Sequence, residues 1–201
     1  MVLSRKGFII MASDTSVHET IVDWVGDVVA VESHIEEALD HQLKLSTGSS
    51  EVGDAIQHFH DTVRDSKKRA VAFQETQGTT AGNPIIKTGA ELLGKAAGVI
   101  DRIRKDTPSK ALRDDYVAFN MAAISYTMLH TTALALEDQK TVAFAAEGLS
   151  TYAKLITKIN SVIPRAVIDD LLANGDVEVK DPNMADNARK TIDQIWKDAA
   201  H

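Results

Sequence analysis

The feature that most constrains this chain is a run of 21 residues, Tyr116 to Leu136, that contains no Asp, Glu, Lys or Arg. The run also lacks Pro and Gly, so no residue in it interrupts a helix. A helix without a charged face has no side that favours full solvation. It is therefore expected in the centre of a bundle, at a subunit interface or in a membrane.

A membrane helix is the first alternative, because 21 residues are long enough to cross a bilayer. Polar side chains punctuate the run, however, at Asn120, Ser125, Thr127, His130, Thr131 and Thr132. Acidic and basic residues mix on both flanks, so neither flank has the basic cluster that orients a membrane helix. A central helix in a soluble bundle is the better interpretation, and we expect no membrane attachment.

The composition excludes several classes of function. Across 201 residues, 22 basic and 29 acidic side chains give a net charge of −7, with no basic tract. Nucleic acid is therefore not an expected partner, because neutralising phosphates supplies most non-specific affinity. There are no cysteines, which excludes disulfides, thiolate metal sites and cysteine nucleophiles, and this suits a cytoplasmic protein. Gly-x-Ser-x-Gly and phosphate-loop motifs are also absent.

Hydrophobic periodicity and the positions of Gly and Pro predict an all-α chain. We expect a disordered leader at 1–14, a four-helix bundle at 15–175, and a linker with a C-terminal helical arm at 176–201. Helices are predicted at about 16–45, 50–77, 84–104, 109–136, 139–162 and 164–174. The long connection with its short helix makes this a ferritin-like antiparallel four-helix bundle.

Ferritin-like bundles commonly hold two metal ions, using Glu residues and Glu-x-x-His pairs that point inward. This chain contains no Glu-x-x-His, and the uncharged run supplies no acid. The following helix supplies only Glu147. Too few inward carboxylates exist for a complete site, which leaves Glu32 and Asp61 as candidates.

Glu32 is the best single candidate, because it lies on the apolar stripe of the first helix, seven residues after Val25 and seven before Leu39. A carboxylate there needs a partner or a metal. One interpretation is a polar core in which facing helices donate hydrogen bonds to Glu32, from among Asn120, Tyr126, Thr127, His130 and Tyr152. The other is a reduced iron or manganese site formed by Glu32, Asp61 and His130.

Several segments resemble the YciE/YciF family of ferritin-like bacterial stress-associated proteins. They are Val31-Glu-Ser-His-Ile35, His58-Phe-His-Asp-Thr62, Leu112-Arg-Asp114 and Tyr126-Thr-Met-Leu129. The resemblance implies the bundle fold over roughly 17–172 and a stress-response context. It also implies Glu residues near 119–122 and 149–152, where this chain carries neutral side chains.

Two functions are therefore expected from different classes. The first is a non-catalytic bundle, without a cofactor, that acts as a homo-oligomer of at least two copies or through a separate protein partner. The alternative is an oxidase or metal-storage protein that binds iron or manganese near Glu32 and Asp61. The departures from the family pattern favour the first.

Overall fold

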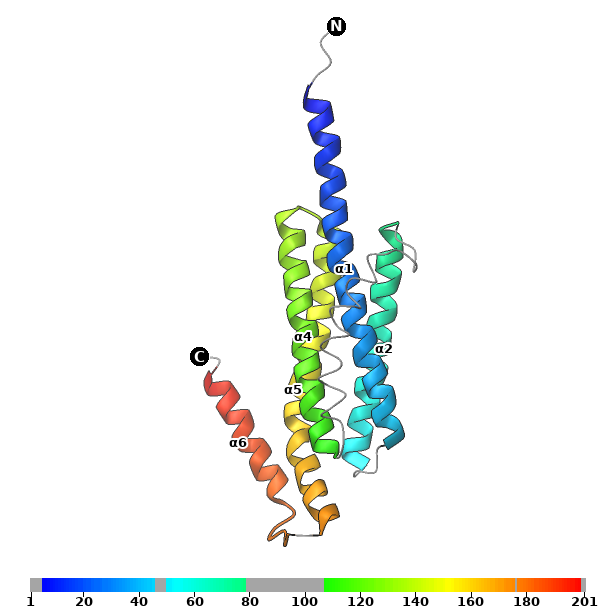
Figure 1. Cartoon of the computed structure of the whole chain (residues 1–201). Helices are drawn as coiled ribbons and strands as arrows, with labels where there is room; N and C mark the ends of the chain where they lie inside the picture. The colour runs from blue at the N-terminus through cyan, green and yellow to red at the C-terminus, as the bar shows by residue number, and fades with distance from the viewer. Residues whose placement is uncertain (1–4, 46–49, 79–106, 176, 200–201) are drawn as a thin grey trace.

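The chain folds as an assembly of long helices joined by turns (Figure 1). The computed structural model describes residues 5–45, 50–78, 107–175 and 177–199. The helices are α1 (Arg5–Leu45), α2 (Ser50–Thr76), α4 (Pro108–Ala135), α5 (Gln139–Asn174) and α6 (Met184–Ala199). No strand occurs in these described ranges, and the predicted all-α class is confirmed. The short helix predicted at 84–104 lies outside the described residues.

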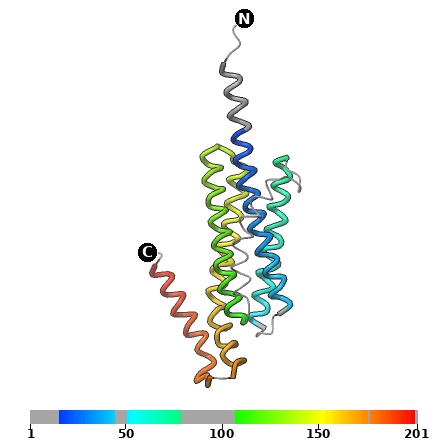
Figure 2. Tube along the Cα trace, in the orientation of Figure 1, coloured from blue at the N-terminus to red at the C-terminus, as the bar shows by residue number. Residues whose placement is uncertain are grey.

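Four of the helices form a bundle of two antiparallel hairpins. α1 packs against α2 and α4, while α5 packs against α4, α2 and α6. In Figures 1 and 2, α1 and α5 run in one direction and α2 and α4 run in the other. α2 and α4 therefore occupy diagonal corners, and the connection between them joins helices that run the same way.

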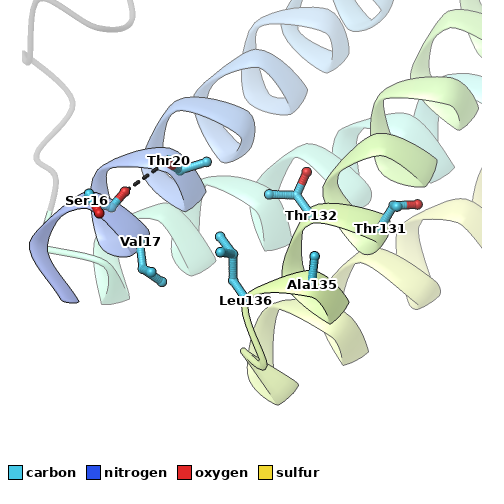
Figure 3. A pocket seen from close by; sticks show the side chains of 7 residues that line it. All are labelled: Ser16, Val17, Thr20, Thr131, Thr132, Ala135 and Leu136. Carbon is cyan, nitrogen blue, oxygen red and sulfur yellow. Dashed lines mark hydrogen bonds between the residues drawn. The ribbon is translucent and has the colours of Figure 1, made fainter. Parts of the chain in front are cut away.

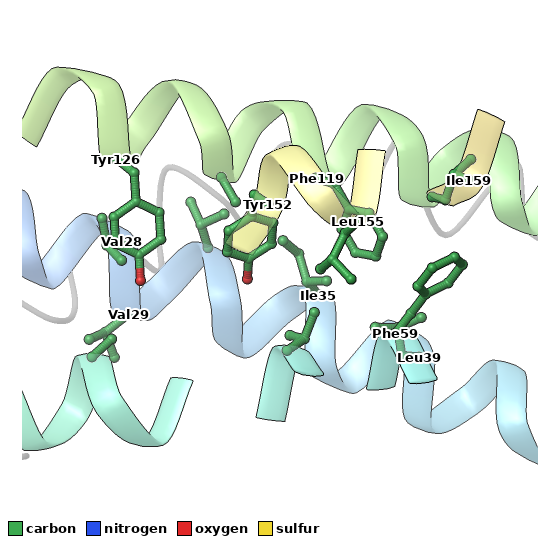
Figure 4. Packing of buried hydrophobic residues seen from close by; sticks show 14 of the residues in the cluster. Val28, Val29, Ile35, Leu39, Phe59, Phe119, Tyr126, Tyr152, Leu155 and Ile159 are labelled. Carbon is green, nitrogen blue, oxygen red and sulfur yellow. The ribbon is translucent and has the colours of Figure 1, made fainter. Parts of the chain in front are cut away.

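The core follows the predicted stripes (Figure 4). The apolar stripe of α1 is buried at all five predicted positions, Ile21, Val25, Val28, Ile35 and Leu39. The stripe of α2 is buried at Val52, Ile56, Phe59, Val63 and Ala70. Burying each of these larger aliphatic or aromatic side chains contributes about 1.5–3 kcal/mol, so the core explains why these helices associate.

Helix α4, which contains the uncharged run from Tyr116, is buried on one face and exposed on the other. The buried residues recur every three or four positions, at Leu112, Asp115, Phe119, Ala122, Tyr126, Leu129 and Ala133. The exposed large apolar residues are Val117, Ile124, Met128 and Leu134. No helix in the described part of the chain is long and apolar enough to span a membrane.

Two predicted helix boundaries are wrong. α1 begins at Arg5 rather than near Ser16, so helix covers most of the segment predicted as a disordered leader. No proline lies between Arg5 and Leu45, so the helix can extend without interruption. The predicted helix boundary at Pro164 is also wrong: α5 runs from Gln139 to Asn174 with Pro164 inside it.

Packing explains why α5 tolerates Pro164. A proline inside a helix removes one backbone hydrogen bond and costs about 3 kcal/mol or more. Pro164 is buried together with Val162 and Ala166, so three core positions on this part of α5 would lose their contacts if the helix ended. Burial of these side chains offsets the lost hydrogen bond.

Local signals set the other boundaries as the sequence suggests. Thr107 is the N-cap residue of α4, and Pro108 follows in the first turn, where a missing N–H costs nothing. Asp138 caps α5 by accepting hydrogen bonds from the backbone amides of Lys140 and Thr141, both at 3.1 Å. Gly175 ends α5 in a left-handed conformation.

The C-terminal arm docks on the body through its first half. Ala185 of α6 is buried. Arg189 donates from Nε to the carbonyl oxygen of Ser161 at 2.7 Å and from Nη2 to Oε1 of Glu51 at 2.7 Å. One arginine therefore ties α6 to both α5 and the start of α2.

Candidate functional site

A buried carboxyl group lies at the centre of the bundle. Glu32, on α1, has no solvent-exposed surface. Its Oε1 atom accepts hydrogen bonds from Ser66 Oγ of α2 at 2.6 Å and from the Tyr126 hydroxyl of α4 at 2.9 Å. Figure 4 shows the hydroxyls of Tyr126 and Tyr152 pointing toward α1. Each of the four bundle helices thus contributes one polar side chain to this group, which we call the polar core.

The electrostatics of the polar core favour protonated groups. Burial raises the pKa of Glu32 above its usual value of 4.5, against smaller lowering effects from the hydroxyls of Ser66, Tyr126 and Tyr152. Burial and the neighbouring Glu32 charge raise the pKa of both tyrosines. The tyrosines therefore remain hydrogen-bond donors, and the interior avoids an isolated negative charge.

Two polar atoms at this site lack a hydrogen-bond partner among the described residues. They are Oε2 of Glu32 and the hydroxyl oxygen of Tyr152, and both are buried. The Tyr152 hydroxyl still lowers the pKa of Glu32, so the two side chains are electrostatic neighbours. A buried carboxyl oxygen without a hydrogen-bond partner destabilises the folded state more when the carboxyl group is ionised than when it is protonated.

Aromatic rings hold the two tyrosines in place. The ring centroids of Tyr126 and Tyr152 are 5.9 Å apart, and Phe119 lies 5.9 Å from Tyr152 in an edge-on arrangement. Phe119 makes a second edge contact, at 5.6 Å, with Phe59. Such contacts add about 0.5–1.5 kcal/mol each beyond area burial, so the hydroxyls are positioned by packing.

Gly148 provides the space for the Tyr126 ring. A Cβ atom at Gly148, in α5, would overlap the Cε1, Cζ and Cδ1 atoms of Tyr126. Gly148 is buried, so the ring cannot move into solvent to relieve the overlap. The hydrogen bond from Tyr126 to Glu32 therefore depends on the absence of a side chain on the facing helix.

The structure does not bring the predicted metal-ligand set together. Asp61 is half-buried on α2 and pairs with Arg64 at 2.9 Å and with Gln57 at 3.1 Å. The hydrogen bond from Gln57, followed by His60 and Arg64, lowers the pKa of Asp61. His130 is half-buried on α4 and is not a partner of Glu32. Within the described ranges, no group of three or more His, Asp or Glu side chains is arranged to hold a metal ion.

The predicted polar-core set is partly assembled. Tyr126 and Tyr152 lie beside Glu32, as the hydrogen-bonding interpretation expects. Asn120 instead donates to the backbone carbonyl of Tyr116 one turn earlier in its own helix, at 2.7 Å. Thr127 is exposed and donates to the carbonyl of Ala123 at 2.8 Å.

Ser66 is a partner of Glu32 that the sequence interpretation misses. A signal for it exists, because Ser66 occupies the stripe position between Val63 and Ala70 on α2. A polar residue on an apolar stripe is a candidate partner for a buried carboxyl on the neighbouring helix. The same criterion, applied to α1, singles out Glu32.

A second buried polar contact joins α1 to α4, near the C-terminal end of α1 and the start of α4. Gln42 donates from Nε2 to Oδ1 of Asp115 at 2.7 Å, and both side chains are buried. On the α1–α2 side, His60 lies 2.8 Å from Asp40 and 3.3 Å from Asp61 through its two ring nitrogens. These contacts fix the register of α1 against its two neighbours.

These features define a closed all-α bundle with a hydrogen-bonded polar core. Comparison with protein families matches residues 16–171 to the family described as "Domain of unknown function (DUF892)". The match covers most of the chain, which therefore belongs to this ferritin-like family. Comparison with curated proteins found no match, and neither did comparison with solved structures.

Proposed function

We propose that this protein is a non-catalytic ferritin-like stress-associated protein, akin to the YciE/YciF proteins, that acts in the cytoplasm by self-association or by binding a protein partner. The observation that carries the proposal is the outer face of α4 from Val117 onward, which is exposed and uncharged, with Val117 63% and Ile124 59% accessible. A contiguous apolar surface on a folded chain is typical of an interaction site.

The polar core supports the non-catalytic part of the proposal. Its one carboxyl group accepts hydrogen bonds at Oε1 from two hydroxyl donors, and the Tyr126 and Tyr152 rings pack beside each other at the same site. Substrate has no described path to Glu32, because Glu32 is fully buried. A hydrogen-bonded core of this kind fixes how the helices pack and needs no reaction to explain it.

Sedimentation equilibrium over a wide concentration range tests the association. We expect a particle of at least twice the chain mass of 21.8 kDa at micromolar concentration. The proposal would be contradicted if the protein stayed monomeric at every concentration and also captured no protein partner from a lysate of stressed cells.

One observation favours the alternative of an iron- or manganese-binding protein. Oε2 of Glu32 has no hydrogen-bond partner in the described structure and lies between four helices. Elemental analysis after growth with added iron or manganese separates the two functions. Two ions per chain, lost in Glu32→Gln and reduced in Asp61→Asn, would support the metal function and overturn the non-catalytic one.

A further inference from the structure

From Val117 to the end of α4, the outer face of the helix forms a continuous uncharged strip. The exposed Lys110 and Arg113 precede the strip on the same side of the helix. Val117, Ile124 and Met128 are exposed at spacings of seven and four, and Thr131 and Ala135 continue the same side of the helix. Every residue between Tyr116 and Leu136 is uncharged. Because a helix rises about 1.5 Å per residue, the strip is roughly 30 Å long.

The strip ends in an open, mostly apolar pocket between α4 and α1 (Figure 3). The pocket has a volume of about 350 Å³. It is lined by Ser16, Val17 and Thr20 of α1 and by Thr131, Thr132, Ala135 and Leu136 at the end of α4. The strip and the pocket therefore share Thr131 and Ala135, and they form one surface.

The arm α6 has a docked half and a free half. Its first half is held by the buried Ala185 and by Arg189. In its second half, Ile195 is 60% and Trp196 is 54% accessible. Figures 1 and 2 show the C-terminal end of α6 standing apart from α4 and α5. An exposed tryptophan beside an isoleucine on a helix is a strong binding anchor, because aromatic side chains carry much of the energy of protein interfaces.

The free half of α6 and the pocket lie at opposite ends of one bundle. Arg189 fixes α6 near Glu51, at the start of α2. The pocket lies at the other end, where α4 finishes beside Ser16 and Val17. The arm of one chain therefore cannot place Trp196 in its own pocket while Arg189 keeps these contacts. An antiparallel second copy would bring its arm to the end where the pocket lies.

Charge favours a second copy as the occupant of this surface. Each chain has a net charge of −7, so most faces of two copies repel each other. The strip on α4 has no charge to repel its own image. The arm around Trp196 is balanced, with Lys190 and Lys197 against Asp193 and Asp198. A two-fold interface requires a self-complementary surface of this kind.

We propose that two copies form an antiparallel two-fold dimer in which the outer faces of α4 meet and the free half of each α6 packs, through Ile195 and Trp196, on the end of the other copy's α4. This inference rests on the proposed self-association and specifies its surface. Each arm would cover the part of the strip from Met128 to Leu136 and the pocket beyond it.

Charge insertion in the strip is the first test. The double variant Ile124→Glu/Met128→Glu should weaken dimerisation about a hundredfold or more in sedimentation, because it places carboxylates in a desolvated contact. The matched control is Ala72→Glu, an exposed alanine on α2, which occupies the corner diagonal to α4. The control should dimerise like the unaltered chain. Circular dichroism confirms that both variants fold.

The fluorescence of Trp196 tests the arm separately. The chain has two tryptophans, and Trp24→Phe leaves Trp196 as the only one. Its emission should shift to shorter wavelength as concentration rises through the dimerisation range. The arm contact would be overturned if the emission maximum of Trp196 stayed at the wavelength typical of tryptophan in water at a concentration where the chain is dimeric.

Pairwise crosslinking shows whether the contact is between copies. The chain has no cysteine, so Ala135→Cys, at the pocket end of α4, and Trp196→Cys each introduce one thiol. Oxidation of a mixture of the two variants should give a disulfide-linked heterodimer in excess over both homodimers. This inference would be overturned, and self-association left intact, if the chain formed a dimer that gave no disulfide-linked heterodimer and that was not weakened by Ile124→Glu/Met128→Glu. A monomer under all conditions would remove both proposals.

Discussion

The inner and outer faces of α4 both lack charge from Tyr116 onward, but for different physical reasons. Tyr126 points into the bundle and donates to Glu32, whereas Met128, two residues later, is exposed. Inside, a charge would lack solvation, and neutral hydroxyls satisfy Glu32, the one acid of the polar core. Outside, water would solvate a charge readily, so the absence of charge from Val117 to the end of α4 requires another cause. The dimer proposed above would supply this cause.

The two regions should therefore respond oppositely to substitution. Changes in the polar core are expected to alter the free energy of unfolding with little direct effect on the association surface. Changes in the outer face are expected to alter association and leave the stability of the single chain nearly unchanged. The following substitutions sharpen this contrast, from the largest expected effect on stability to the smallest.

Gly148→Ala should cause the largest loss, about 3 kcal/mol or more of unfolding free energy, because its methyl group overlaps the Tyr126 ring. Urea unfolding measures the change. Combining it with Tyr126→Ala should cost less than the sum of the two single changes, since the smaller side chain removes the overlap. Strict additivity in this cycle would mean that Gly148 does not act through Tyr126.

Tyr126→Phe removes one of the two donors to Glu32 Oε1 and should cost about 1–2 kcal/mol. The comparison variant is Tyr152→Phe, which removes a hydroxyl that also lowers the pKa of Glu32 but lies outside hydrogen-bond geometry in the described structure. We expect this variant to cost clearly less. Equal losses in thermal or urea unfolding would contradict the hydrogen-bond assignment.

Glu32→Gln should be tolerated, with a change of less than about 1 kcal/mol at neutral pH, because the amide oxygen still accepts from Ser66 and Tyr126. Glu32→Ala should be clearly worse, since it leaves both hydroxyls without their acceptor and opens a cavity. A large loss in the Gln variant would show that the negative charge itself is needed.

The pH dependence of stability gives a further test of Glu32. Because its pKa is raised in the folded state, the native protein binds more protons than the unfolded chain between pH 4.5 and the raised value. The contribution of Glu32 to stability is thus fully present below about pH 4.5 and is lost as pH rises through the raised pKa. Unfolding profiles of the unaltered chain and Glu32→Gln should diverge across this window. Parallel profiles would contradict the raised pKa.

Ile124→Ser should have the smallest effect on the single chain, within about 0.5 kcal/mol, because the side chain is exposed. Unfolding at a concentration low enough to give monomers measures this. The same substitution should weaken the dimer in sedimentation. A large loss of monomer stability would show that Ile124 packs within its own chain, and the contrast between the two regions would fail.

The bundle is predictable from the sequence because its helices carry regular stripes. The stripe of α1 places Val25, Glu32 and Leu39 inward at intervals of seven residues, so periodicity alone identifies the buried carboxyl group. The two core tyrosines are predictable because they are large amphipathic residues on helices that face Glu32. Gly148 is not predictable in this way, since a glycine within a helical pattern does not reveal which facing side chain needs its space.

Long-range pairing is the harder part to predict. His130 shares the uncharged run with Tyr126, and one-dimensional periodicity does not decide which of the two faces Glu32. The sequence does not predict that Val117 and Ile124 are exposed either, because an uncharged run is consistent with burial on every side of the helix. The continuity of α5 through Pro164 depends on packing that a local proline rule does not include.

The contact between Gly148 and the Tyr126 ring has a consequence for related chains. Two positions on neighbouring helices share one volume, so they are expected to change together during divergence. A relative with alanine or a larger residue at the position of Gly148 should have lost the tyrosine at the position of Tyr126, and with it this donor to the acid of the first helix. Aligned sequences that keep the tyrosine opposite a bulky residue would imply a differently shaped interior.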